Sequence, residues 1–301
     1  MTALQKPFLK WVGGKTQIIH KITEKIPDEI NNYHEPFLGG GSVLFALVTL
    51  VKNKKINVKK KIYAYDINHR LIQVYKHIQN NKDELYSFIE KYINEYDKIT
   101  TTIVNRNPTT HEEAKTSKES YYFWARNKFN TIDNTSVESS ALFMFLNKTG
   151  FRGMYREGPN GFNIPYGNYK KTPTIITKDE LDKISDLIKD VIFIHCDFST
   201  AMSKVKKGDF VYLDPPYAPE TKKSFVGYVK DGFNLEMHDK LFKEVKKIND
   251  KKIKFIMNNA KVELVTSQFS ENDYNCEDVI ARRAINSKNP QATTTEIIIY
   301  N

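Results

Sequence analysis

Hydrophobic and polar positions along the chain form two kinds of segment. Short apolar runs of strand length end in distinctive loops, and longer stretches with helical spacing separate them. The apolar runs predict strands up to Phe37 and at 60–66, 209–213, 251–260 and 293–301, whereas 42–51 and 234–248 predict helices. Strands that alternate with helices indicate an α/β fold with a parallel sheet.

The middle of the chain has a different pattern. From about residue 78 to residue 174 it is polar, with helical blocks at 82–96 and 118–132, and it ends in a stretch rich in glycine and arginine. We expect a mainly helical domain, 78–174, inserted between the two halves of a sheet domain, 1–77 and 175–301. The turn sequence at 157–161, EGPNG, predicts a β-hairpin within the insertion.

The excess of basic over acidic residues indicates which classes of partner the protein can bind. Lys and Arg outnumber Asp and Glu by 46 to 36 in 301 residues, which gives a net charge of +10 and favours a polyanion such as nucleic acid or an anionic membrane. The alternative is that the charge serves solubility alone. The longest apolar stretch, 42–51, is too short to span a bilayer, and the N-terminus lacks a signal-peptide pattern. We therefore expect an intracellular, cytoplasmic protein with no membrane partner.

Three loops at strand ends carry candidate chemistry. Gly39, Gly40 and Gly41 precede a helix, where a backbone can approach an anionic group closely, although a plain turn is equally compatible. Asp66 follows the next strand, at the position that binds ribose hydroxyls in nucleotide-binding folds, or else it caps the following helix. In a parallel sheet these loops and Asp214 share one edge.

The third loop, Asp214-Pro215-Pro216-Tyr217, ends a buried strand. Its prolines restrict the backbone, so that an acid, a carbonyl group and an aromatic ring are fixed together. These groups suit a flat heterocycle that carries an NH2 group. The alternative is a strand terminus with an incidental acid.

Six motifs occur in the order found in Dam-like DNA adenine-N6 methyltransferases, the alpha group of amino-methyltransferases that use S-adenosylmethionine. They are FLKWVGGK (8–15), EPFLGGGSVLF (35–45), YDIN (65–68), NKTGFRGMYR (147–156), FNIPYGNYKK (162–171) and DPPYAP (214–219). The resemblance covers residue 7 to the C-terminus and is weakest at 83–117. It implies a Rossmann-like sheet with an inserted target-recognition domain.

The resemblance also implies roles for single residues. The target adenine, flipped out of the duplex, is received by Asp214, Pro215, Pro216 and Tyr217. S-adenosylmethionine, which leaves as S-adenosyl-L-homocysteine, is bound by Trp11, Gly13, Gly14, Lys15, Glu35, Phe37, Gly39, Gly41, Asp66, Asp197, Phe198 and Asp214. No metal is expected.

Double-stranded DNA is the implied partner, and a separate restriction endonuclease is compatible with the resemblance. Basic residues alternate with aromatic residues from 148 to 171, a pattern that suits phosphate contact and insertion beside an extruded base. An ordinary basic surface hairpin is the alternative. The expected DNA-binding residues are Lys10, Phe151, Arg152, Met154, Arg156, Pro165, Tyr166, Arg282, Arg283 and Lys288.

Specificity is predicted from two arginines. Arg156 aligns with the arginine of the family that binds guanine. Relatives that methylate GATC usually carry Asn where this chain has Arg152, so we expect a different short palindrome, such as CATG. Two other functions remain open: cytosine-N4 methylation in the same kind of socket, and a non-catalytic DNA-binding subunit on the same fold.

Overall fold

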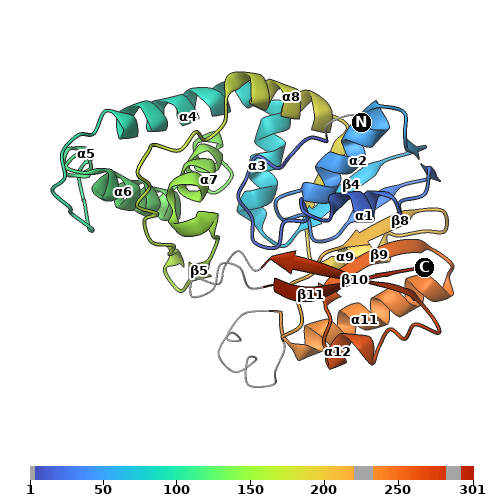
Figure 1. The fold of residues 1–301 in the computed structure, drawn as a ribbon. Coiled ribbons are helices and arrows are strands. Elements are labelled where there is room, and N and C mark those ends of the chain that lie inside the picture. The colour runs from blue at the N-terminus through green and yellow to red at the C-terminus, as the bar shows by residue number, and fades with distance from the viewer. Residues whose placement is uncertain (1–3, 220–232, 283–292) are drawn as a thin grey trace. The chain divides into compact units, whose positions relative to one another are not determined.

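The computed structural model describes residues 4–219, 233–282 and 293–301 (Figure 1). These residues form two compact units. Unit 1 contains the described residues up to Lys6, Lys15–Ile67 and Asp190–Asn301, and unit 2 contains Pro7–Gly14 and Asn68–Lys189. The division into domains after residues 77 and 174 stays a prediction.

Unit 1 is built on a seven-stranded sheet with the order β10-β11-β9-β8-β2-β4-β7. The neighbours from β9 to β7 pair in parallel, whereas β11 is antiparallel to both β9 and β10. The predicted α/β class with a largely parallel sheet is confirmed. The strands are β2 (Tyr33–Glu35), β4 (Ile62–Asp66), β7 (Val191–His195), β8 (Phe210–Leu213), β9 (Lys254–Ala260), β10 (Asn275–Arg282) and β11 (Thr293–Tyr300).

The antiparallel edge of the sheet follows from the short connection between its last two strands. Only residues 283–292 connect β10 to β11, and a parallel crossover needs a dozen or more residues. The two strands therefore pair antiparallel over their full lengths, from Asn275 opposite Tyr300 to Arg282 opposite Thr293.

The direction in which strands are added reverses between β2 and β8. From β2 the chain moves outward to β4 and β7, and it then returns to the other side of β2 for β8 and β9. In open α/β sheets ligands bind at such a reversal, outside the carboxyl ends of the strands. Glu35 ends β2 and Asp214 directly follows β8, so both lie where a ligand is expected.

Two long helices of unit 1 have apolar faces whose side chains are buried in the core of the unit. α2 (Ser42–Lys52) buries every residue from Val43 to Thr49, and α11 (Leu235–Asp250) buries Leu241, Val245 and Ile248 at helical spacing. Side chains of β8, β9 and β11 complete the core around α11. The remaining elements are α1 (Ile19–Thr23), β1 (Glu29–Ile30), β3 (Asn57–Val58), α9 (Phe198–Ser203) and α12 (Glu263–Thr266).

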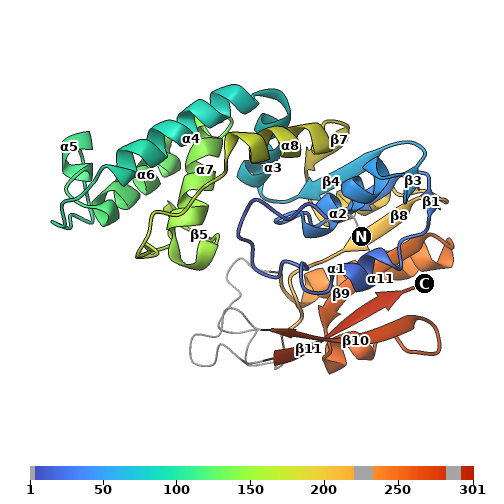
Figure 2. The same cartoon turned by 45° about the horizontal axis from the view of Figure 1, so that its top comes forward.

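Unit 2 is mainly helical and is organised around α7 (Val137–Thr149). This helix buries side chains on all sides because α3, α4 and α6 pack against it (Figures 1 and 2). Ser117 and Ser136 cap α6 and α7 by accepting hydrogen bonds from backbone N–H groups. The elements are α3 (His69–Asn80), α4 (Lys82–Asp97), α5 (His111–Ala114), α6 (Lys118–Thr131), α7, η1 (Phe151–Gly153), the antiparallel pair β5 (Glu157–Gly158) and β6 (Gly161–Phe162), and α8 (Lys178–Ile188).

Candidate active site

The glycine loop after β2 is held against the end of β4. Asp66 Oδ2 accepts a hydrogen bond of 2.9 Å from the backbone N–H of Gly39. Gly39 and Gly41 have φ values of 50° and 72°, in the left-handed region that favours glycine. The structure therefore brings the predicted loop and Asp66 together at the carboxyl edge of the sheet.

The alternative role of Asp66 as a helix cap is wrong. Asn68 caps α3 instead, and its Oδ1 accepts a hydrogen bond of 3.0 Å from the N–H of Leu71. The Asp66 carboxylate is thus directed to the glycine loop and not to the helix that follows it.

Glu35 is a buried acid at the end of β2, with 2% of its side chain exposed. Burial raises its pKa to about 8, the nearby carboxylates of Asp214 and Asp66 act in the same direction, and the hydrogen bond of 2.6 Å from the Tyr33 hydroxyl opposes them. A carboxyl group that keeps its proton at neutral pH ionises when a cation approaches. Glu35 therefore suits a positively charged ligand group.

Asp214 forms an ion pair with Lys15, and the Oδ2–Nζ distance is 2.8 Å. The exposed fractions of the two side chains are 20% and 4%, so the pair is largely withdrawn from water. Burial raises the pKa of Asp214, and Lys15 lowers it. The motif lysine thus balances the charge of the motif acid, although the two are far apart in the sequence.

Tyr217 is fixed from two directions. Its hydroxyl donates a hydrogen bond of 2.8 Å to Oε2 of Glu296 on β11, and Nζ of Lys15 lies 4.9 Å from the centre of its ring. Pro215 is buried and Pro216 is exposed. Sequence reasoning missed Glu296; its signal is a single acid that precedes the apolar run of the last strand.

Asn259 on β9 holds the backbone just after the motif. Its fully buried side chain accepts a hydrogen bond of 3.0 Å from the N–H of Ala218. Sequence reasoning missed this residue too, although two adjacent amides, Asn258 and Asn259, inside an otherwise apolar strand are an available signal.

The residues after β7 have local structural roles. Asp197 caps α9: its Oδ1 accepts from the N–H groups of Ser199 and Thr200 at 2.8 and 3.3 Å, and its Oδ2 accepts from the Thr200 hydroxyl at 2.7 Å. These bonds, led by that from the Thr200 side chain, lower the pKa of Asp197. Phe198 is buried and stacks on Phe37, with ring centres 5.5 Å apart.

The segment Pro7–Gly14 belongs to unit 2, whereas Lys15 belongs to unit 1. Trp11 stacks on Phe143 of α7, with ring centres 6.4 Å apart, and Gly13 turns the chain with a φ of 81°. Gly14 closes the turn by donating to the Trp11 carbonyl at 3.3 Å. The cofactor role expected for these three residues stays a prediction.

Asn147 of α7 fastens Lys10 within unit 2. The Asn147 side chain accepts from the Lys10 N–H at 2.9 Å and donates to the carbonyls of Lys10 and Gly153 at 2.8 and 3.0 Å. The exposed Lys10 ammonium lies 4.5 Å from the ring centre of Tyr169. Three of the motifs that carry the resemblance therefore meet here.

Three predicted DNA-binding residues follow α7 directly. Phe151 and Arg152 are exposed, and Arg152 has a φ of 57°, which is rare for a residue other than glycine. The Arg152 guanidinium lies 5.2 Å from the centre of the Phe151 ring. Met154 is half-buried.

The next three flank the β5–β6 hairpin, with Arg156 directly before it and the other two after it. Arg156 and Pro165 are exposed, and the Pro165 carbonyl accepts a hydrogen bond of 2.9 Å from the N–H of Phe151. Tyr166 is half-buried, and its hydroxyl lies 2.8 Å from that of Tyr96. The structure thus brings together Phe151 and Pro165, from two different motifs.

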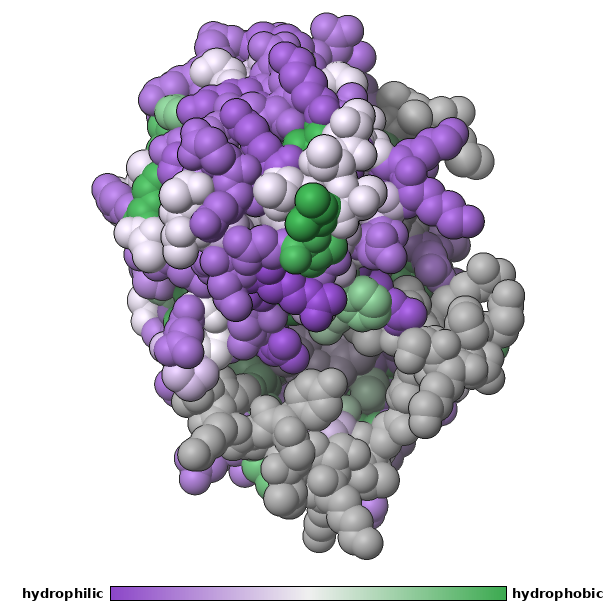
Figure 3. Space-filling view, turned by 90° about the vertical axis from the view of Figure 1, so that its left-hand side faces the viewer, coloured by the Kyte–Doolittle hydropathy of each residue, from purple (hydrophilic) through white to green (hydrophobic). Residues whose placement is uncertain are grey.

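Not all aromatics of this segment are available for DNA. Phe162 is 3% exposed, and the half-buried Tyr155 ring lies 5.1 Å from that of Phe143. Phe162 therefore belongs to the core of unit 2, where its ring lies 5.7 Å from that of Phe129 on α6. The face of unit 2 in Figure 3 is mostly hydrophilic, with few exposed hydrophobic side chains.

Three predicted residues fall outside this description. Arg283 and Lys288 lie outside the described residues, as does the side chain of Arg282 at the end of β10. Among the residues that the structure does describe, no helix is long and apolar enough to cross a membrane. The same residues contain no group of three or more His, Cys, Asp or Glu side chains arranged to hold a metal ion.

Comparisons of the sequence with a family model and with known proteins agree on one family. A family model described as D12 class N6 adenine-specific DNA methyltransferase matches residues 11–285. Type II methyltransferase M.MjaIII of Methanocaldococcus jannaschii is 36% identical over 293 residues, which are 94% of this chain and 93% of that protein. Type II methyltransferase M1.LlaDCHI of Lactococcus lactis subsp. cremoris is 30% identical over 98% of this chain and 95% of its own. A DNA adenine methylase of Haemophilus influenzae is 30% identical over 84% and 79%.

Proposed function

The chain belongs to the D12 class of N6 adenine-specific DNA methyltransferases, and we propose on that basis that the carboxyl edge of the unit 1 sheet is its catalytic centre. The family and the site-specific methylation of adenine in DNA, both predicted from the sequence, are confirmed. One observation supports the placement most strongly. Asp214 leaves β8 at the point where the strand order reverses and pairs with the buried Lys15 at 2.8 Å.

The residues present fit S-adenosylmethionine, which the family uses. Glu35, which ionises when a cation approaches, suits the cationic part of the cofactor, and the Asp66 carboxylate suits ribose hydroxyl groups. The left-handed glycines let the loop backbone approach the ligand. When bound, the cofactor supplies a methyl group already activated by its sulfonium and leaves as S-adenosyl-L-homocysteine. We propose for this reason that the reaction needs no metal.

The target amine is activated by position. Its lone pair is delocalised into the adenine ring, and hydrogen bonds from N6–H to Asp214 and to the Pro215 carbonyl turn that lone pair out of the ring plane. Lys15 binds Oδ2 of Asp214, so we assign Oδ1 to the amine. These preorganised acceptors stabilise the charge that develops on N6 before it releases a proton.

The adenine must leave the duplex to reach this socket. Tyr217 offers a ring face on which the flipped base stacks, and Glu296 holds that ring through the tyrosine hydroxyl. Stacking on an aromatic ring replaces part of the stacking lost in the duplex.

Unit 2 is proposed to recognise the target sequence. The exposed side chains of Lys10, Phe151, Arg152, Arg156 and Pro165 support this role. Cations contact phosphates, and an arginine fork contacts guanine O6 and N7. A motif other than GATC, such as CATG, remains our proposal, based on Arg152.

A separate restriction endonuclease is a further proposed partner. Two relatives are named type II methyltransferases, which supports a place for this chain in a restriction-modification pair.

Single-molecule sequencing tests the proposal. DNA is taken from cells that lack all other methylation and express either this protein or its Asp214→Ala variant. We expect N6-methyladenine at one short motif with the wild type and none with the variant. Cytosine-N4 methylation, or full methylation by the variant, would contradict the proposed centre. A GATC motif would contradict only the role given to Arg152.

A further inference from the structure

Arg156 is the residue proposed to bind guanine. Its guanidinium is held by hydrogen bonds to Asn163, which follows the β5–β6 hairpin. Its Nε donates a hydrogen bond of 2.7 Å to Oδ1 of Asn163. Its Nη2 donates a longer bond of 3.5 Å to the Asn163 carbonyl oxygen, and the Asn163 N–H donates back to the Arg156 carbonyl at 3.1 Å. Asn163 therefore binds one whole edge of the guanidinium, the edge formed by Nε and Nη2.

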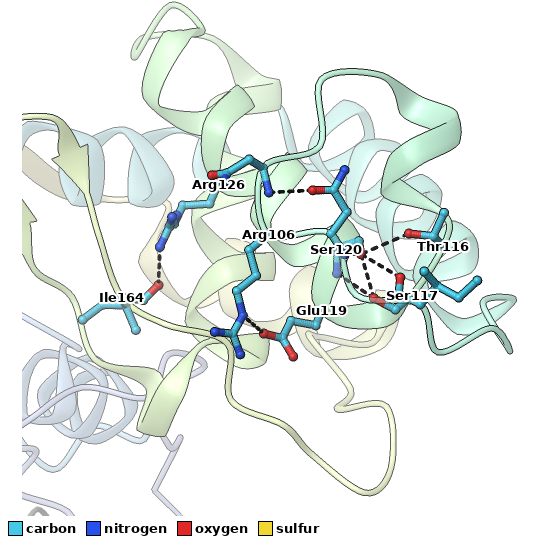
Figure 4. Close-up of polar contacts among 10 residues, drawn as sticks. Arg106, Thr116, Ser117, Glu119, Ser120, Arg126 and Ile164 are labelled. Carbon is cyan, nitrogen blue, oxygen red and sulfur yellow. Dashed lines mark hydrogen bonds and ion pairs between the residues drawn. The ribbon is translucent and has the colours of Figure 1, made fainter.

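The backbone around Asn163 is anchored on both sides. Before it, the Asn130 side chain brackets Phe162, accepting from its N–H at 2.8 Å and donating to its carbonyl at 3.0 Å. After it, the Ile164 carbonyl accepts a hydrogen bond of 2.8 Å from the Tyr122 hydroxyl. The same carbonyl accepts a hydrogen bond of 3.3 Å from Arg126 Nη1 (Figure 4). Asn130, Tyr122 and Arg126 all belong to α6, so this helix fixes the backbone on both sides of Asn163.

Gly158 leaves room for the Asn163 side chain. A Cβ at residue 158 would lie 2.6 Å from Nδ2 of Asn163, closer than van der Waals contact allows. An alanine at this position would displace the Asn163 amide without changing residue 163 itself. The hairpin sequence thus offers a second, independent way to disturb the contact.

The orientation has a chemical consequence. A guanidinium has five N–H donors, and Asn163 occupies those along one edge. The end formed by Nη1 and Nη2 remains, and its two parallel donors match the O6 and N7 acceptors of guanine. A guanidinium held in one orientation loses less conformational entropy on binding than a mobile one.

We propose that Asn163 is a positioning residue that orients Arg156 end-on toward a guanine of the methylated motif. This inference rests on the proposed function, in which Arg156 contacts guanine. Both Arg156 and Asn163 are exposed, so their contact contributes little to the stability of unit 2. Its loss changes discrimination between bases and not folding.

The test uses the full-length protein and duplexes that carry its own motif, once sequencing has identified it. Each guanine of the motif is replaced in turn by 7-deazaguanine, which lacks the N7 acceptor. We expect the kcat/KM of the wild type to fall about tenfold at one position, within the range for a bidentate arginine contact. Asn163→Ala should reduce that sensitivity to about threefold or less, and Gly158→Ala should reduce it partly.

Two comparisons separate positioning from a general defect. Asn163→Ala combined with Arg156→Ala should behave as Arg156→Ala alone, because Asn163 acts through the arginine. Asn160→Ala, an exposed amide in the turn of the same hairpin, serves as the matched control and should keep the sensitivity of the wild type. Thermal unfolding of Asn163→Ala should match that of this control.

The outcomes are distinct. Undiminished 7-deazaguanine sensitivity in Asn163→Ala would overturn the inference, as would a motif without guanine or a wild type insensitive at every guanine. In each of these cases adenine is still methylated and the proposed catalytic centre stands, whereas the last two outcomes would also remove the guanine contact proposed for Arg156. Absence of N6-methyladenine with the wild type would instead overturn the proposed function.

Discussion

At the scale of single residues, the ion pair between Lys15 and Asp214 controls the charge state of the motif acid. A buried acid with a raised pKa is a weak acceptor unless a cation keeps it ionised, and Lys15 lies 2.8 Å away. A lysine that neutralises an acid over this distance also limits how far the acid can move. The pair therefore sets both the charge and the position of the group that we propose accepts the adenine amine.

Replacing Asp214 by Ala should lower the methyl-transfer rate by about 10²-fold or more, as loss of a preorganised acceptor does elsewhere. Binding of S-adenosylmethionine should change far less. Single-turnover transfer of labelled methyl groups measures the first quantity, and calorimetry measures the second. Asp239→Ala, an exposed acid on α11, is the control, and unchanged turnover in Asp214→Ala would refute the assignment.

Glu35 predicts a pH dependence of stability. Its carboxyl group titrates near 4.5 in the unfolded chain and at about 8 in the folded protein, so the folded state holds the extra proton between these values. The free energy of unfolding therefore falls as pH rises through this window, by at most about 1.4 kcal/mol per pH unit. Glu35→Gln removes that loss and keeps an acceptor for Tyr33.

Urea denaturation of the wild type and Glu35→Gln at several values between pH 5 and pH 8 measures the effect. The stability of the variant relative to the wild type should increase steadily across the series. A difference that stays constant with pH would show that Glu35 ionises normally in the folded protein.

At the scale of elements, the last strand supports the loop that we propose to be catalytic. β11 lies beyond β9 from β8, yet its Glu296 reaches the Tyr217 hydroxyl at 2.8 Å. Asn259 on β9 binds the backbone of the same loop at Ala218. The antiparallel insertion of β11 thus provides a side chain that a fully parallel sheet would not place there.

A double-mutant cycle tests this support. Tyr217→Phe and Glu296→Ala should each lower kcat by about tenfold, the size expected for a hydrogen bond to a charged group. The double variant should be no slower than either single variant, because both remove the same contact. Glu296→Gln, which keeps an acceptor, should be the mildest change. Additive losses would mean that Glu296 acts independently of Tyr217.

At the scale of the whole molecule, the net charge of +10 predicts that the affinity for DNA depends strongly on salt concentration. Each phosphate contact contributes about −0.9 to the slope of log K against log salt concentration. Lys170 and Lys171 are exposed in the segment proposed to contact DNA. Replacing both by Gln should make the slope less negative by about 2 and leave the methylated motif unchanged.

Lys55 and Lys60 provide the matched control. They are also exposed, and they lie in another run rich in lysine, 52–61, which belongs to unit 1. Replacing both by Gln should leave the slope unchanged. If instead only this pair altered the salt dependence, the DNA path would follow unit 1 and the role proposed for Lys170 and Lys171 would be wrong.

Local pattern alone determined much of this protein. The helix from Ser42, the strands that end at Asp66 and Leu213, and the family itself follow from short stretches of sequence. Hydrophobic periodicity acts over a few residues, and the motifs combine residue types that the chemistry requires at fixed spacing. These features can therefore be predicted from the sequence without knowledge of the fold.

Only the tertiary structure decided which distant residues meet. It paired Lys15 with Asp214, Tyr217 with Glu296 and Asn147 with Lys10. It also showed that the Phe162 side chain is buried in the core and that Asn68, rather than Asp66, caps α3. Such partnerships depend on strand order and helix packing, which are set by the burial of the whole chain, and no short stretch of sequence carries that information.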